Sequence, residues 1–185
     1  MKNIIIFASG RGSNCEAILE HFRDSDNVQV VAIVTNKNDA GVINLATDWG
    51  IKTLLLNKTI LESPVFLDNL EPLNADLLVL AGFLLKIPDF LIEEFPNKIV
   101  NIHPSLLPKY GGKGMYGSRV HEAVLENEEK ESGISIHLVN EEYDQGTILL
   151  QKSVAVVEYD TVETLADKIH DLEHEWFPKV VESLL

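Results

Sequence analysis

Two residues near the end of an apolar stretch have side chains that can move a proton or stabilise a developing charge. In "IVNIHP", Asn101 and His103 stand two residues apart, and the stretch then stops at Pro104. An imidazole exchanges a proton near neutral pH, and a carboxamide N–H can donate to an oxygen that becomes negative. Both side chains could also satisfy their hydrogen bonds inside a rigid, proline-terminated turn. The residue types alone leave both roles open.

Asp144 is a candidate carboxylate partner for this histidine. It lies in "NEEYDQG", where Gly146 indicates a sharp turn, and an Asp in such a turn often bonds only its own backbone. A carboxylate that faces His103 would stabilise the imidazolium and raise its pKa, which suits a proton shuttle. We therefore expect Asp144 to face His103.

The segment "FASGRGSN" has the composition of an anion-binding turn. It follows a hydrophobic strand and precedes a helical pattern, so Gly10 and Gly12 would turn the backbone and point its N–H groups outward. Phosphate is the expected ligand, although an ordinary strand-to-helix turn can have the same glycine-rich pattern. The glycines do not fit G-x-G-x-x-G, and the segment lacks the Lys of an NTPase phosphate loop.

The segment "HDLEH" fits the H-x-x-E-H pattern of some zinc peptidases through His170, Glu173 and His174. Two histidines four residues apart can share a helix face. Few residues follow to supply a third ligand, so we expect no metal site.

The pattern of apolar residues predicts the elements that position these side chains. Short Ile- and Val-rich runs alternate with helical patterns, which is typical of a parallel sheet with crossover helices. We expect the α/β class: one Rossmann-like domain over residues 1–185, with a mostly parallel central sheet, helices on both faces, and a C-terminal strand pair plus helix. Strands are expected at residues 3–9, 28–35, 52–57, 75–82, 98–102, 132–140 and 147–157, and helices at about 14–23, 39–49, 62–72, 88–94 and 118–127.

This arrangement places the candidate residues in a cleft. In an open α/β sheet, ligands bind beyond the carboxyl ends of the strands, where Asn101 and His103 fall. A last helix should begin with a capping box of Asp160 and Glu163. Its apolar stripe is expected to be Val162, Leu165, Ile169, Leu172, Trp176 and Val180, which would turn Glu173 away from the core.

Composition excludes several classes of protein. The chain has 185 residues, 45% of them hydrophobic, and a net charge of −14, which would repel nucleic acid. No window approaches the ~18 apolar residues of a membrane span. The single Cys15 cannot close an intrachain disulfide, so we expect a cytoplasmic protein.

Four segments in this order and spacing resemble the phosphoribosylglycinamide formyltransferase family of folate-dependent formyltransferases. They are "SGRGSN", "LAGF", "NIHPSLLPKY" and "SGISIHLVNEEYDQGTILLQ", and the similarity runs from residue 1 to about 180. The resemblance implies transfer of a formyl group from 10-formyltetrahydrofolate to the amine of glycinamide ribonucleotide in purine biosynthesis. It implies two small-molecule substrates, no nucleic acid, no membrane, and a monomer or homodimer.

The resemblance also implies roles for individual residues. Asn101 and His103 would stabilise the oxygen of a tetrahedral intermediate, and Asp144 would keep the His charged and help to move the proton. His137 belongs to the same segment, in a direct or a supporting role. The phosphate and glycinamide would be bound by Gly12, Ser13, Asn14, His170 and Glu173, and the folate by Leu84, Leu85, Lys86, Ile87, Asn101, Asn140, Glu141, Glu142, Tyr143 and Asp144.

The chain departs from the family pattern at several places. Leu85 stands where an Arg is common, and a basic residue expected near residue 60 is missing, which leaves Lys58 or Lys113 as candidates to hold the folate tail. The glycine-rich loop at residues 111–117 is longer than the common form. We expect a mobile lid whose Lys113 or Arg119 approaches an anionic ligand.

Three other functions fit parts of the sequence. A formyltransferase for another amine and a formyltetrahydrofolate hydrolase share the superfamily motifs, but the phosphate turn argues against both. A noncatalytic phosphate-binding module of similar fold is the third alternative.

Overall fold

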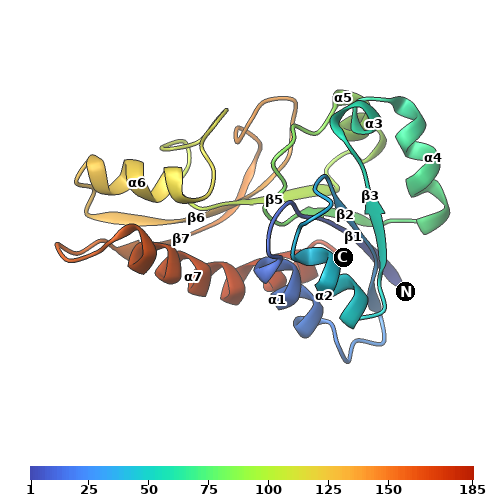
Figure 1. Ribbon diagram of the computed structural model, residues 1–185, viewed down its shortest axis with the longest axis horizontal. Helices are drawn as coiled ribbons and strands as arrows, with labels where there is room; N and C mark the ends of the chain where they lie inside the picture. Colours follow the sequence, from blue (N-terminus) through green and yellow to red (C-terminus); the bar gives the residue numbers. More distant parts are fainter.

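Seven strands form a single sheet in this protein. They are β1 (Lys2–Phe7), β2 (Val28–Thr35), β3 (Lys52–Leu55), β4 (Leu77–Leu80), β5 (Ile99–His103), β6 (Glu131–Leu138) and β7 (Ile148–Ala155). The computed structural model describes residues 1–185, with the strand order β3-β2-β1-β4-β5-β6-β7 (Figure 1). The first five strands pair in parallel, and β6 pairs antiparallel with β5 and β7. The expected fold class is confirmed.

Helices cover both faces of the sheet. They are α1 (Ser13–His21), α2 (Val42–Asp48), α3 (Lys58–Leu61), α4 (Leu67–Leu70), α5 (Asp89–Glu94), α6 (Ser118–Glu126) and α7 (Val162–Ser183). In Figure 1, α1, α2 and α7 lie on one side of the sheet, and α3, α4 and α5 lie on the other. None of these helices combines the length and the apolar character that a membrane crossing requires.

The core is divided by the sheet into two clusters. Ile4 and Ile6 of β1 pack with α1, α2 and α7, whereas Ile5 and Phe7 pack with α3, α4 and α5. All four side chains are fully buried. Successive residues of a strand point to opposite faces of the sheet. A strand that is covered on both faces therefore has a continuous apolar sequence, as β1 does.

The segment expected to form one helix over residues 62–72 is broken into short turns. Two 3-10 turns, Pro64–Phe66 and Glu71–Leu73, flank the four-residue α4. A proline fixes its own φ and lacks the N–H that continues a helix. The predicted single helix is wrong because Pro64 and Pro72 outweigh the apolar periodicity.

The start of α7 also differs from the prediction. Thr161 is the N-cap, and it forms the capping box with Thr164 rather than Asp160 with Glu163. Asp160 instead accepts hydrogen bonds from the N–H of Val157 (2.8 Å) and from Nζ of Lys168 (2.6 Å).

The buried stripe of α7 is rotated relative to the predicted stripe, and this changes the position of Glu173. The fully buried line runs through Leu165, Ile169, Glu173, Phe177 and Val181, at intervals of four residues, while the predicted Leu172, Trp176 and Val180 are half-buried. Glu173 therefore faces inward with 6% of its surface exposed. The expectation that it turns away from the core is wrong.

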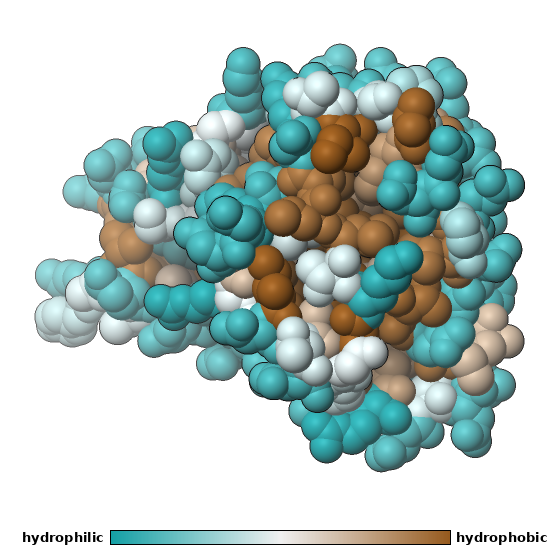
Figure 2. Space-filling view, turned by 45° about the vertical axis from the view of Figure 1, so that its right-hand side comes forward, coloured by the Kyte–Doolittle hydropathy of each residue, from teal (hydrophilic) through white to brown (hydrophobic).

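Apolar side chains remain exposed beside the edge strand β3. Leu55, Ile60 and Val65 are 55%, 44% and 64% exposed. This side of the molecule is brought forward in Figure 2, where apolar side chains gather at the centre of the face and hydrophilic ones surround them.

The strand order also creates a switch point. The chain runs from β1 outward through β2 and β3, then returns to place β4 on the other side of β1. The helices that follow β1 and β4, α1 and α5, lie on opposite faces of the sheet, which leaves a crevice at the carboxyl ends of the two strands.

Candidate active site

A cavity of about 960 Å³ occupies this crevice. Residues that follow β1 (Ser9, Gly10), residues that follow β4 (Ala81–Leu84) and the end of β5 (Asn101–Pro104) all line it. The loop at residues 112–118 and the inner face of α7 complete the wall. The cleft location expected for Asn101 and His103 is therefore observed.

Asp144 lies between two buried imidazoles. Its Oδ2 is 3.6 Å from Nδ1 of His103, and its Oδ1 is 3.6 Å from Nε2 of His137. The side chains of the two histidines are 5% and 3% exposed, and that of Asp144 is 12% exposed. The structure thus brings together His103 and Asp144, as the sequence predicted, and adds His137 to the pair.

The register of β5 and β6 explains why His137 is close to Asn101. The two residues are directly opposite in the antiparallel ladder, and Nδ2 of Asn101 lies 3.1 Å from Nε2 of His137. The other ring nitrogen, Nδ1, lies 2.9 Å from the carbonyl oxygen of Leu138, which can only accept. A neutral His137 therefore carries its proton on Nδ1 and accepts at Nε2 from Asn101. One N–H of the Asn101 amide remains free.

His103 has a hydrogen-bond acceptor beside each ring nitrogen. Nε2–H donates to the carbonyl oxygen of Tyr110 (2.8 Å), and Nδ1 faces Asp144. Burial nevertheless lowers the pKa of His103, and the charge of Asp144 and the Tyr110 carbonyl raise it only in part. The prediction that Asp144 raises this pKa gave the right direction for one contribution and omitted the larger effect of burial.

Asp144 is held as a carboxylate by its surroundings. Burial acts to raise its pKa, but the nearby His137 and His103 and a 2.8 Å hydrogen bond from the N–H of Gly112 outweigh burial, so the pKa is lowered. Asp144 adopts a positive φ of 56°. A Cβ on Gly146, two residues later, would overlap the carbonyl oxygen of Leu138. This position requires glycine for the turn that aims Asp144.

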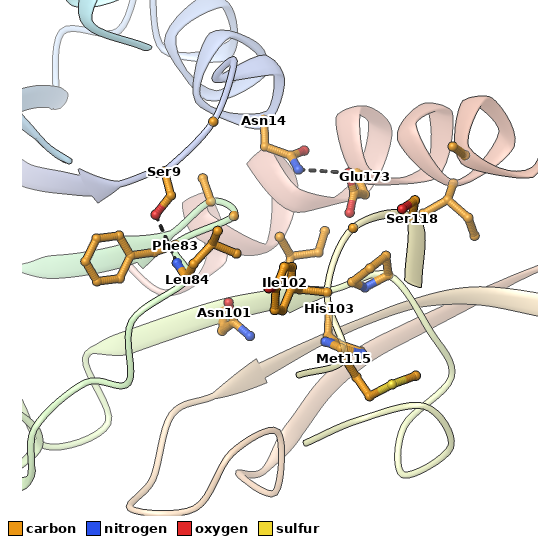
Figure 3. Close-up of a pocket in the computed structure, with 18 of the residues that line it drawn as sticks. Ser9, Asn14, Phe83, Leu84, Asn101, Ile102, His103, Met115, Ser118 and Glu173 are labelled. Atoms are coloured by element: carbon orange, nitrogen blue, oxygen red, sulfur yellow. Dashed lines mark hydrogen bonds between the residues drawn. The ribbon is translucent and has the colours of Figure 1, made fainter. Parts of the chain in front are cut away.

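The phosphate-type turn meets α7 across the same cavity. Gly12 adopts φ 92° at the start of α1, and Gly12, Ser13 and Asn14 all line the cavity. Nδ2 of Asn14 donates to Oε2 of Glu173 at 2.8 Å (Figure 3). Burial raises the pKa of Glu173, and the Asn14 hydrogen bond and the nearby His170 only partly oppose this.

Comparison with known proteins agrees with this geometry. A family model described as formyl transferase matches residues 2–181. A phosphoribosylglycinamide formyltransferase from Bacillus subtilis is 36% identical to this chain, over 100% of this chain and 95% of that protein. The chain belongs to the formyl transferase family. The crystal structure of a phosphoribosylglycinamide formyltransferase from Bacillus halodurans superposes with a TM-score of 0.90 at 33% identity, and covers 100% of this chain and 95% of that one.

A plant member of the formyl transferase family has a higher identity but a longer chain. The chloroplastic phosphoribosylglycinamide formyltransferase of Arabidopsis thaliana is 45% identical over 99% of this chain. This chain spans 65% of the length of that protein.

In this member of the family, the "HDLEH" segment divides between two faces of α7. His170 and His174 are exposed, with parallel rings whose centroids are 6.1 Å apart. Glu173 points inward and bonds Asn14. No group of three His, Cys, Asp or Glu side chains is arranged to hold a metal ion.

Only some of the residues assigned to folate by resemblance reach the cavity. Leu84, Tyr143 and Asp144 line it together with Asn101. Leu85 and Ile87 pack on the hydrophobic core instead, and Lys86 lies 3.9 Å from Asp89. Asn140 accepts a hydrogen bond from the N–H of Glu142 at 3.1 Å and, like Glu141 and Glu142, does not line the cavity.

The glycine-rich loop contributes one cation to the cavity. Lys113 lines it, with Met115 and Tyr116 on the same wall. The guanidinium of Arg119 lies 5.2 Å from the centre of the Tyr116 ring and does not line the cavity. Lys58 lies 3.5 Å from Glu62, outside it.

Two buried polar residues of the cavity wall, Ser9 and His121, were not singled out from the sequence. Ser9 is 2% exposed and accepts a hydrogen bond from the N–H of Leu84 at 3.0 Å, which joins the loops after β1 and β4 (Figure 3). His121 is 4% exposed on α6. No signal in "SRVHEAV" marks it as part of the wall.

Proposed function

We propose that this protein transfers the formyl group of 10-formyltetrahydrofolate to the amine of glycinamide ribonucleotide. The observation that carries the proposal is the position of Asp144 between His103 and His137, beside a free N–H of Asn101. Family membership gives the class of reaction, and this cluster of side chains supports the end of β5 as the reacting centre. Figure 3 shows Asn101 and His103 in the lower part of the pocket, with the apolar Phe83 and Leu84 to their upper left and the Asn14–Glu173 pair above them.

The turn after β1 would bind the phosphate. Gly12, Ser13 and Asn14 sit at the start of the nine-residue α1, where N–H groups and the helix dipole favour an anion. Arg11, within this turn, and Lys37 also line the cavity. In a chain with a net charge of −14, these two cations give the turn a local positive field.

The buried carboxyl of Glu173 would receive the amine end of the ribonucleotide. A buried carboxylate is costly without a partner, which is why its pKa is raised. A substrate N–H group beside it would supply that partner. His170, which also lines the cavity, would lie on the outer side of the same group.

The chemistry would then proceed by addition and elimination. The amine nitrogen forms a bond to the formyl carbon, and the carbonyl electron pair moves to its oxygen, which becomes negative. The free N–H of Asn101 would donate to this oxygen. His103 would take up the proton of the attacking amine, and the imidazolium so formed, stabilised by Asp144, would add a positive charge close by. The proton of the amine passes to the folate nitrogen through these groups, and the bond from carbon to that nitrogen breaks.

The apolar part of the wall would hold the flat pterin ring. Leu84 and Tyr143 are each 39% exposed, although apolar side chains of this size are usually more buried. Phe83 lines the cavity beside them. Lys113 is the cation available on the loop for the carboxylates of the folate tail.

A direct assay tests the proposal. The protein would be mixed with glycinamide ribonucleotide and a 10-formylfolate donor, and the ultraviolet change of the donor would be followed. Formylation that depends on both substrates is expected. Loss of the formyl group at the same rate without the ribonucleotide would indicate a hydrolase instead, and no reaction would refute the proposal.

A further inference from the structure

His121 is a buried histidine that the chemistry above does not use. It lies on α6, is 4% exposed, and lines the cavity that holds Asn101 and His103. Its helix is anchored by Val124, which belongs to the hydrophobic core, and it packs against α7.

The two ring nitrogens of His121 differ in their surroundings. Nδ1 is sealed from solvent and has no hydrogen-bond partner. Nε2 has no hydrogen-bond partner in the protein either, but it is not among the sealed atoms. Because the residue lines the cavity, Nε2 is the nitrogen that a bound molecule can reach. More than 90% of buried polar groups in proteins are paired, so a histidine with two unpaired nitrogens calls for a physical reason.

The ring is neutral at physiological pH. The pKa of His121 is lowered to about 4, chiefly by burial; nearby His170 and His103 act in the same direction, and Glu122 opposes them. A neutral imidazole carries one proton, on Nδ1 or on Nε2. Among backbone groups, a buried N–H without a partner is rarer than an unpaired acceptor. The same preference places the proton of His121 on Nε2, so that Nε2–H points toward the cavity as a donor.

The position of His121 indicates which of the two substrates it would contact. Its helix, α6, packs against α7, and His170 and Glu173 of α7 line the same cavity. Phe83 and Leu84, which follow β4, lie to the left of His103 in Figure 3, whereas Glu173 lies to its upper right. His121 therefore faces the space between the reacting centre and the pair Asn14–Glu173.

We infer that Nε2–H of His121 donates a hydrogen bond to a carbonyl or hydroxyl oxygen of the amine substrate, between its phosphate and its amine. This inference rests on the proposed function. It assigns to His121 a binding role for the ribonucleotide and none for the folate donor. It also explains why Nε2 has no hydrogen-bond partner in the protein, since a donor that is kept for a ligand is unpaired when the ligand is absent.

The test uses three substitutions that separate the two nitrogens. His121→Gln places an amide N–H near the position of Nε2, His121→Asn places one near Nδ1, and His121→Leu removes both. Loss of one neutral hydrogen bond lowers affinity by about 10-fold. We expect KM and Kd for glycinamide ribonucleotide to rise about 10-fold in His121→Asn and His121→Leu, and to stay within about threefold in His121→Gln. In all three, KM for the 10-formylfolate donor should stay unchanged.

Val124→Ala is the matched control, because it loosens the same helix without touching the cavity. It should lower Tm and leave both KM values unchanged. His121→Leu should have a Tm equal to or above that of the natural chain, because it removes an unpaired buried nitrogen.

Calorimetric titration of glycinamide ribonucleotide, without folate, separates the possible failures. If the natural chain does not bind the ribonucleotide, the proposed function fails and this inference fails with it. If the natural chain binds and turns over but His121→Leu and His121→Asn bind equally well, the inference alone is overturned. A rise in KM that Val124→Ala reproduces would also overturn it.

Discussion

The side-chain amide of Asn14 donates a 2.8 Å hydrogen bond to Oε2 of Glu173, across 159 residues of sequence. This contact joins the glycine turn after β1 to the middle of α7. The remaining carboxyl oxygen of Glu173 is left without a partner inside a mostly apolar helix face. Glu173 is therefore positioned at a cost to stability, which is typical of a group kept for a ligand.

Glu173→Gln should separate the effect of Glu173 on stability from its effect on substrate binding. Because the pKa of Glu173 is raised, the folded protein holds its proton more tightly than the unfolded chain. That stabilisation is complete below about pH 4.5 and is lost as the pH rises through the raised pKa. Gln stays neutral, so the Tm of Glu173→Gln minus that of the natural chain should grow as the pH rises from 4.5 to 8.

At pH 7.5 the same variant should bind glycinamide ribonucleotide at least about 10-fold more weakly, as expected for loss of a charge-assisted hydrogen bond. Glu175→Gln is the control, because Glu175 is exposed on the same helix and lies 3.3 Å from Lys179. A Tm difference that does not change with pH would contradict the burial argument.

Asp144→Asn should lower kcat by at least ~100-fold, the scale of a lost proton-transfer partner or oxyanion stabiliser. The neutral amide cannot stabilise the imidazolium of His103. Affinity for the ribonucleotide should survive within about threefold, as measured by calorimetry. Glu142→Gln, an exposed change two residues earlier, should have natural kcat. Near-natural turnover in Asp144→Asn would rule out the pairing.

The pH profile of Asp144→Asn provides a second test of the pairing between Asp144 and His103. Burial lowers the pKa of His103, and the charge of Asp144 opposes that effect. Without this charge the pKa of His103 should fall further, so the imidazolium is lost at lower pH. The basic limb of residual kcat should therefore move to lower pH than in the natural chain.

The sequence predicted the parts of the site that depend on local patterns. The apolar runs predicted the strands, and a Pro after "NIH" predicted that Asn101 and His103 end one of them. Strand direction then placed both residues in the cleft. The structure also brings Asp144 to His103, at 3.6 Å, although the catalytic roles of these residues remain proposals.

The parts that the sequence missed depend on tertiary packing. α7 has apolar residues on two adjoining stripes, one through Leu172 and Trp176 and one through Ile169 and Phe177. Periodicity cannot choose the inward stripe when the core lies on one side and a cavity on the other. Glu173 was therefore assigned to the wrong face. His137 gained its place from the β5–β6 register, which no local pattern specifies.

His137→Phe should reduce kcat about 10-fold with little change in either KM. Phe fills the volume but cannot accept the hydrogen bond that orients the Asn101 amide. His137→Gln retains an acceptor and should recover part of the loss, whereas a purely structural role would give Gln no advantage over Phe at equal Tm. Steady-state kinetics and thermal melts of both variants decide between the two.

Lys113→Ala and Arg119→Ala should differ. Lys113 lines the cavity, so Lys113→Ala should raise KM for an anionic substrate by two- to fivefold, the scale of an exposed ion pair. Arg119 stacks on Tyr116 outside the cavity, so its removal should change neither KM. The Lys113 effect should shrink at high salt. Equal effects of both changes would point to loop order rather than to charge.

Gly146→Ala should abolish most activity although the new methyl group lies outside the cavity. A Cβ at this position would overlap the carbonyl oxygen of Leu138, so the turn must shift. The shift would move Asp144, whose two carboxyl oxygens serve different histidines, and a displacement of 1 Å can cost ~100-fold in rate. We expect both a lower Tm and a kcat as low as that of Asp144→Asn.

Gly50→Ala controls for the general effect of replacing a glycine. Gly50 has φ +66° and open space around its Cβ position, so its replacement should cost about 1–2 kcal/mol of stability and no activity. If Gly146→Ala and Gly50→Ala lose equal stability but only Gly146→Ala loses turnover, the turn acts by aiming Asp144. If Gly146→Ala keeps natural kcat, the reaction tolerates a displaced carboxylate. The reaction then does not depend on the position of Asp144 between the two histidines.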